Sequence, residues 1–141
     1  MSKLKNKYVV HTLRTLFALF FLFSGIGGLF GGGDMQGVPA PMIDALVALQ
    51  TNGLFYMIKI TEVIAGLMLL FNIFPALAVI FLAPIAVGVV VFNAMIAPVY
   101  VVTGLIVCLI EIYFGYVYWD QYKPLFMRKK KIMPATMPTQ Q

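Results

Sequence analysis

The 141-residue chain contains one cysteine and one histidine. Because Cys108 is alone, the chain has no internal disulfide and no Cys-x-x-Cys redox pair. Because His11 is also alone, the sequence offers no histidine pair for a haem and no cluster of metal ligands. We therefore expect no metal site, and a redox role would require a centre carried by another protein.

Charged residues are also scarce, at 11% of the chain, whereas 62% of the residues are hydrophobic and the mean hydropathy is +0.95. This is too much apolar side chain for a water-soluble domain. The net charge of +5 comes from both ends, where Lys3, Lys5 and Lys7 precede the first apolar stretch and residues 128–131 follow the last. Basic flanks of this kind indicate membrane topology rather than nucleic-acid binding, and they are also compatible with contact to anionic lipid headgroups.

Four apolar stretches are long enough to span a bilayer, which takes about 20 residues per helix. They lie at residues 8–30, 54–74, 76–96 and 99–119. We predict an all-α integral membrane four-helix bundle, a multi-pass protein of the bacterial-type inner (plasma) membrane. Both basic ends are expected to be cytoplasmic, which agrees with an even number of crossings.

The chain is predicted to form one membrane domain over residues 1–126, followed by a basic, disordered cytoplasmic tail at 127–141. Residues 31–52 contain no Lys or Arg, as expected for an outer loop. Within this loop, Pro39 and Pro41 precede an apolar stripe with helical spacing, formed by Met42, Ile43, Leu46 and Leu49. A short amphipathic helix is expected there, either packed over the bundle for stability or moving as a lid.

Polar residues inside the predicted spans fall into two layers when their depth is counted at about 1.5 Å per residue. Arg14 and Glu111 lie in the cytoplasmic half at similar depth, and we predict a buried ion pair between them. The outer half collects four polar residues: Lys59, Glu62, Asn93 and Thr103. We predict these four as a substrate or proton site, although the same charges would also serve only to fix helix register.

Lys59 and Glu62 are three residues apart, so they share one face of the second span and can pair directly. Ala65 and Gly66 follow on the same face and would let another helix approach closely. At the end of the fourth span the sequence gathers aromatic residues, namely Tyr113, Tyr116, Tyr118, Trp119 and Tyr122. They are typical of an interfacial belt, and the alternative is a stacking surface for a quinone ring.

Three sequence elements together resemble the DoxX family of small membrane proteins, over about residues 10 to 120. They are Arg14 before Phe21-Leu22-Phe23-Ser24-Gly25, then Glu62-x-x-Ala65-Gly66-Leu67-x-Leu69-Leu70, and then Leu82-Ala83-Pro84-Ile85 with Phe92-Asn93. Many members carry a Lys shortly after the Ser-Gly of the first span, where this chain has Gly28. The resemblance implies a four-helix membrane protein, and some relatives are described as the membrane subunit of thiosulfate:quinone oxidoreductase.

Three functions follow as hypotheses. The first is a non-catalytic membrane subunit or accessory of a quinone-linked oxidoreductase, with a polar intramembrane site, a quinone as ligand and a partner redox subunit. The second is a small proton-coupled transporter that uses a membrane carboxylate. The third is a structural or assembly protein without chemistry. We expect no enzymatic activity from the isolated chain, which would associate with a partner protein or with further copies of itself.

Overall fold

The computed structural model describes residues 5–31 and 36–127, and all the regular elements in this part of the chain are helices, without strands. Apart from Met127, the predicted tail lies outside the described residues, as do the glycines at 32 and 33. The elements in chain order are α1 (Lys7–Phe30), α2 (Ala40–Thr51), α3 (Leu54–Leu70), α4 (Pro75–Ile96), the 3₁₀ turn η1 (Pro98–Tyr100), α5 (Val101–Val117) and α6 (Trp119–Phe126).

Local sequence signals account for most helix ends. The side chain of Asn6 accepts a hydrogen bond from the Tyr8 N–H at 3.1 Å and caps the start of α1. Gly53, with φ +79°, separates α2 from α3, which meet at an angle of 85°. α4 begins at Pro75, a position where a missing N–H costs nothing.

α1 and α3 pack with their backbones close together because glycines lie at the contact. A Cβ atom on Gly25 would lie 3.0 Å from the Lys59 carbonyl oxygen, and one on Gly66 would lie 3.2 Å from the Ala18 carbonyl oxygen. Larger residues at either position would push the two helices apart. The predicted small face of the second span is therefore the face that contacts α1.

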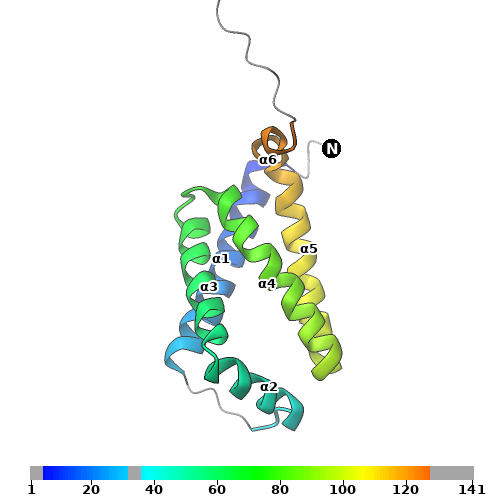
Figure 1. Cartoon of the computed structure of the whole chain (residues 1–141). Coiled ribbons are helices and arrows are strands. Elements are labelled where there is room, and N and C mark those ends of the chain that lie inside the picture. The colour runs from blue at the N-terminus through cyan, green and yellow to red at the C-terminus, as the bar shows by residue number, and fades with distance from the viewer. Residues whose placement is uncertain (1–4, 32–35, 128–141) are drawn as a thin grey trace, which may run out of the picture.

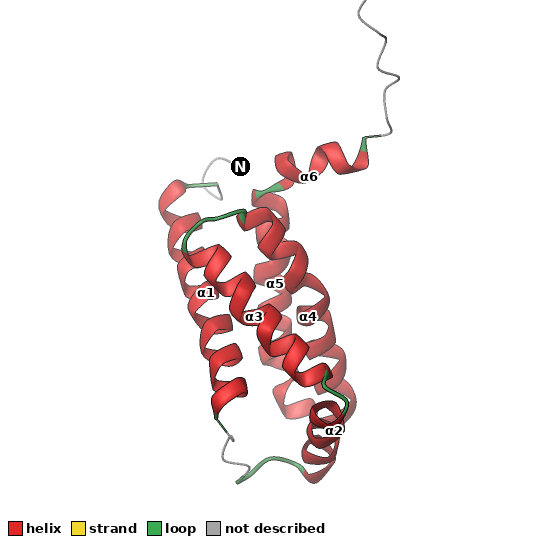
Figure 2. Cartoon of the chain, turned by 60° about the vertical axis from the view of Figure 1, so that its left-hand side comes forward, coloured by secondary structure: helices red, strands yellow, loops and turns green. Residues whose placement is uncertain are grey.

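α4 and α5 form a second closely packed pair, in which Gly104 lies against the backbone of Val90. The two pairs meet through α3 and α4 and through the rings of Phe17 and Phe114, whose centroids are 5.6 Å apart. Toward the end where α2 lies, α4 and α5 diverge from α1 and α3 (Figure 1). The start of α1 and the short α6 lie at the opposite end (Figure 2).

Three helical segments are long and apolar enough to cross a membrane: α1, α4 and the η1–α5 segment at 98–117. α3 has 17 residues, and together with α2, bent by 85°, it would make a fourth. Many large apolar side chains of these helices are exposed, among them Phe23, Met57 and Leu109. The chain is therefore an all-helical membrane protein whose outer surface contacts lipid.

The predicted spans at 8–30 and 76–96 match α1 and α4 to within one residue. The second span ends earlier than predicted, at Leu70, because Asn72 and Phe74 both adopt positive φ and cannot continue the helix. A helix at Ala40–Thr51 covers the predicted amphipathic stripe, whose apolar residues are half-buried while Asp44 is exposed. α4 continues as one helix through Pro84.

Candidate functional site

Lys59 and Glu62 form an ion pair on the face of α3 that contacts α1, with Glu62 buried and Lys59 half-buried. The Lys59 Nζ lies 3.0 Å from Glu62 Oε2 and 3.2 Å from Oε1, and it also donates a hydrogen bond to Ser24 Oγ at 3.0 Å. The side chains of Lys59 and Glu62 are 15% and 4% exposed. This cluster is closed, since the ammonium group and both carboxylate oxygens have partners within it.

Gly28 of α1 provides the space that the Lys59 side chain occupies. A Cβ atom on Gly28 would lie 2.7 Å from both Cδ and Cε of Lys59, whereas one on Gly27 would have no neighbour within 4 Å. The absence of a side chain at Gly28 therefore leaves room on α1 for the stem of Lys59. Phe55, one turn earlier on α3, lies with its ring centroid 5.6 Å from the ammonium group.

Asn93 and Thr103, predicted to share a site with Lys59 and Glu62, are not joined to them by any hydrogen bond in the described part of the chain. The buried Asn93 donates from Nδ2 to the Tyr100 carbonyl oxygen at 3.2 Å, which ties the end of α4 to η1, and Thr103 is exposed. Counting residues predicts the height of a side chain but not the direction in which it points. The divergence of α4 and α5 from α3 also separates residues that share that height (Figure 1).

The predicted ion pair between Arg14 and Glu111 does not form. Arg14 instead donates from Nη1 to Asn72 Oδ1 at 2.6 Å, and its Nη2 lies 3.0 Å from His11 Nδ1. The contact between Phe17 and Phe114 explains the failure, since Arg14 lies one turn before Phe17 on α1 and Glu111 one turn before Phe114 on the opposed α5. The two charged groups are therefore offset in opposite directions, by about 9 Å along the helix axes.

Glu111 is buried, and neither carboxylate oxygen has a hydrogen-bond partner among the described residues. It lines a pocket of about 440 Å³ between α4 and α5, to which α6 also contributes lining residues. The remaining wall is almost entirely apolar and includes Ala86, Ile112, Gly115, Trp119 and Phe126. A buried carboxyl group without a partner costs stability, so its position beside a pocket makes this the candidate site.

Part of the predicted aromatic group belongs to this pocket. The rings of Trp119 and Phe126 stack with centroids 5.7 Å apart, and both line the wall. Tyr122 also lines it and donates from its hydroxyl group to the Ala76 carbonyl oxygen at 2.8 Å, which fixes α6 against the start of α4. Burial raises the pKa of Tyr122 to about 12, so the hydroxyl group keeps the proton that this hydrogen bond needs.

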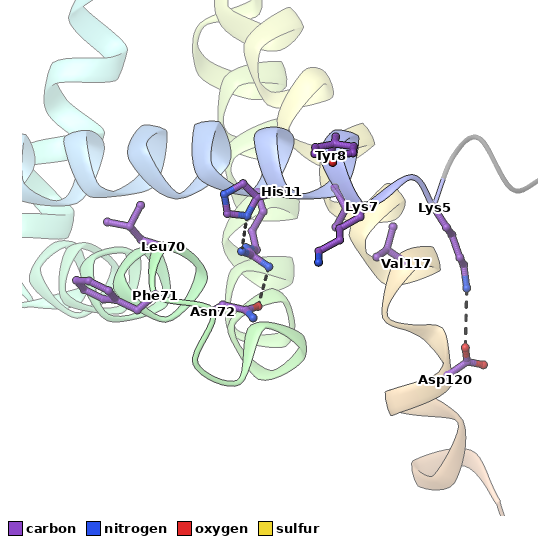
Figure 3. A pocket seen from close by; sticks show the side chains of 11 residues that line it. Lys5, Lys7, Tyr8, His11, Leu70, Phe71, Asn72, Val117 and Asp120 are labelled. Atoms are coloured by element: carbon purple, nitrogen blue, oxygen red, sulfur yellow. Dashed lines mark hydrogen bonds and ion pairs between the residues drawn. The ribbon is translucent and has the colours of Figure 1, made fainter.

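Sequence reasoning missed three contributors: Ser24, Asn72 and α6. Ser24 is weakly polar and looked like part of an apolar span. Asn72 carried the stronger sequence signal, because an asparagine in a short connection ahead of a proline is typical of a turn residue with positive φ. Its side chain can then reach another helix. The cationic end of the molecule around Arg14 and Asn72 has a pocket of its own, with Lys7 and His11 in its wall (Figure 3).

The helices and their buried polar groups define a multi-pass membrane protein with a closed ion pair on one helix pair and an unpartnered carboxyl group on the other. The family model described as DoxX matches residues 9–95, which is more than half of the chain, and the chain belongs to this family. The match includes Arg14, Lys59 and Glu62 but ends before Glu111. Comparison with curated proteins gave no match, and comparison with solved structures gave none either.

Proposed function

We propose that this protein is a non-catalytic membrane subunit or accessory of a quinone-linked oxidoreductase, and that the pocket between α4 and α5 is its quinone site. The observation that carries the proposal is the Glu111 carboxyl group, which is buried without a partner in an otherwise apolar wall. Quinone carbonyl oxygens accept hydrogen bonds, and a neutral carboxyl group donates one. The ring and its apolar tail suit the remaining surface.

The pocket has the size and lining expected for such a ligand. Its volume of about 440 Å³ falls within the usual range for small-molecule sites, which is roughly 300–1,000 Å³. Trp119 and Phe126 contribute aromatic side chains to the same wall. A bound quinone accepts two electrons and two protons, and the electrons would come from the redox centre of a partner subunit.

The same proposal includes a topology with four crossings in a bacterial-type inner membrane, formed by α1, α3, α4 and α5. At about 1.5 Å per residue, α3 is roughly 25 Å long, somewhat short of a bilayer core of about 30 Å. α2, which meets α3 at 85°, would then lie along the outer membrane surface. The basic residues before α1 and after α6 would hold both ends in the cytoplasm.

The experiment is a titration of the purified protein in detergent with a short-tailed benzoquinone, followed by fluorescence. Trp119 is the only tryptophan of the chain and lines the pocket, so a quinone bound there quenches a single reporter. We expect saturable quenching. Glu111→Leu removes the hydrogen bond and should weaken the apparent affinity about ten-fold.

A second pair of variants tests the place of binding. Gly115 lines the pocket, and a Cβ atom there would have no neighbour within 4 Å, so the larger side chain of Gly115→Leu should occupy the pocket and abolish saturable quenching. Gly88→Leu is the matched control, because Gly88 is equally open but does not line the pocket. Quenching that rises linearly with quinone, or that is equal in both variants, would mean that the quinone only partitions into the micelle, and the proposal would be wrong.

A further inference from the structure

A second pocket, of about 800 Å³, lies at the end of the molecule where α1 begins. Its wall combines the first turns of α1 with the α3–α4 turn and the start of α6, and it shares no lining residue with the Glu111 pocket. The labelled side chains come from three separate segments, at residues 5–11, 70–72 and 117–120 (Figure 3). Its polar residues are Lys5, Lys7, His11, Arg14, Asn72 and Asp120.

Arg14 is the buried cation of this pocket. It is 9% exposed, and within the described ranges no carboxylate lies within 4.0 Å of it. A guanidinium group has five N–H donors. Two of its nitrogens contact Asn72 and His11, which are not anions, and the enclosed Nε has no partner. The guanidinium group of Arg14 is therefore held in place, but no carboxylate in the described part of the chain neutralises its charge.

The charges around Arg14 do not supply the missing anion. Among the described residues of the wall, Asp120 is the only acidic one, and it lies 3.9 Å from the ammonium group of Lys5, with both side chains well exposed. Lys7 has no hydrogen bond or ion pair within the described part of the chain. Three cations and one carboxylate leave an excess of two positive charges around the cavity.

We propose that this pocket binds a phosphate group, with Arg14 as its fixed donor and Lys7 as the flexible cation at its mouth. Phosphate oxygens match the planar fork of a guanidinium group, and two positive charges suit a phosphate anion. Asn72 and His11 fix the guanidinium, so little side-chain freedom is lost on binding. The phosphate belongs either to a lipid headgroup or to a small soluble phosphate.

The experiment measures thermal unfolding of the full chain in a neutral detergent against three additives at constant ionic strength. They are phosphatidic acid, a diacylglycerol with the same acyl chains, and inorganic phosphate. We expect phosphatidic acid to raise the unfolding temperature with a saturable dose dependence and diacylglycerol not to. Equal stabilisation by inorganic phosphate assigns the site to soluble phosphates, and stabilisation by phosphatidic acid alone assigns it to the lipid.

Lys7→Gln tests the pocket without disturbing the buried residues and should weaken the apparent affinity about five-fold. Arg14→Gln should weaken it at least about ten-fold in whatever fraction of this variant folds. Lys123→Gln is the matched control, since Lys123 is an exposed lysine of α6 that does not line the pocket, and it should leave the affinity unchanged.

Two results would overturn the proposal. In one, diacylglycerol stabilises the protein as much as phosphatidic acid, or neither lipid nor phosphate does. In the other, Lys123→Gln loses as much affinity as Lys7→Gln, which would reflect the general positive charge of this end rather than a built site. Neither result depends on quinone binding, so this inference stands or falls separately from the proposed function.

Discussion

Each helix pair contains a buried carboxyl group, and the two groups differ in whether they have a bonding partner. Between α1 and α3, Glu62 forms an ion pair with Lys59, which also donates a hydrogen bond to Ser24. Glycines at this contact let the two backbones approach closely. Between α4 and α5, Glu111 has no partner in the described structure and borders an apolar pocket. A carboxylate that is fully paired supports the fold, whereas one left unpaired beside a cavity is retained at a cost to stability and is the better candidate for function.

The largest effect is expected where the closed cluster is opened. Glu62→Leu leaves the Lys59 ammonium group buried with only a serine hydroxyl for a partner, and it should reduce the free energy of unfolding by about 3–5 kcal/mol. Unfolding by SDS in mixed micelles measures this change.

The double variant Lys59→Met with Glu62→Leu is the control for that measurement. Removing both charges leaves an apolar contact of similar volume, so most of the stability should return. If the double variant were less stable than Glu62→Leu alone, the ion pair would not explain the loss.

A smaller effect is expected from the space that Gly28 leaves for Lys59. Gly28→Ala places a methyl group where the lysine stem lies and should cost about 1–3 kcal/mol in the same assay. The neighbouring Gly27→Ala has room for its methyl group and should be neutral or stabilising by up to about 1 kcal/mol, because alanine favours helix. Equal losses in both variants would show that the lysine stem is not held there.

Hydropathy was sufficient to predict the helical class, the limits of α1 and α4, and a helix at Ala40–Thr51, because each depends on local composition and on proline or glycine at the ends. The pairing of Lys59 with Glu62 also followed from spacing on one helix. Contacts between different helices did not follow from the sequence in this way. Whether Arg14 meets Glu111 or Asn72 depends on the rotation and relative shift of helices, which the Phe17–Phe114 contact sets and which residue counting does not contain.

The pocket at Glu111 was harder to foresee for a related reason. Its wall requires α6 to fold back against α4, and the hydrogen bond from Tyr122 to the Ala76 carbonyl oxygen holds it there. In the sequence these aromatic residues are typical of an interfacial belt, and nothing local distinguishes Trp119, which lines the pocket, from Tyr116, which does not.

The stability of Glu111→Leu relative to the original chain tests the contrast between the two carboxyl groups most directly. Because Glu111 has no hydrogen-bond partner to lose among the described residues, we expect the variant to be as stable as the original chain or more stable, by up to about 1–3 kcal/mol, in SDS unfolding. A loss of stability comparable to that of Glu62→Leu would contradict this expectation. Glu111 would then be a paired, structural carboxylate, and its carboxyl group would no longer support a binding site at the pocket.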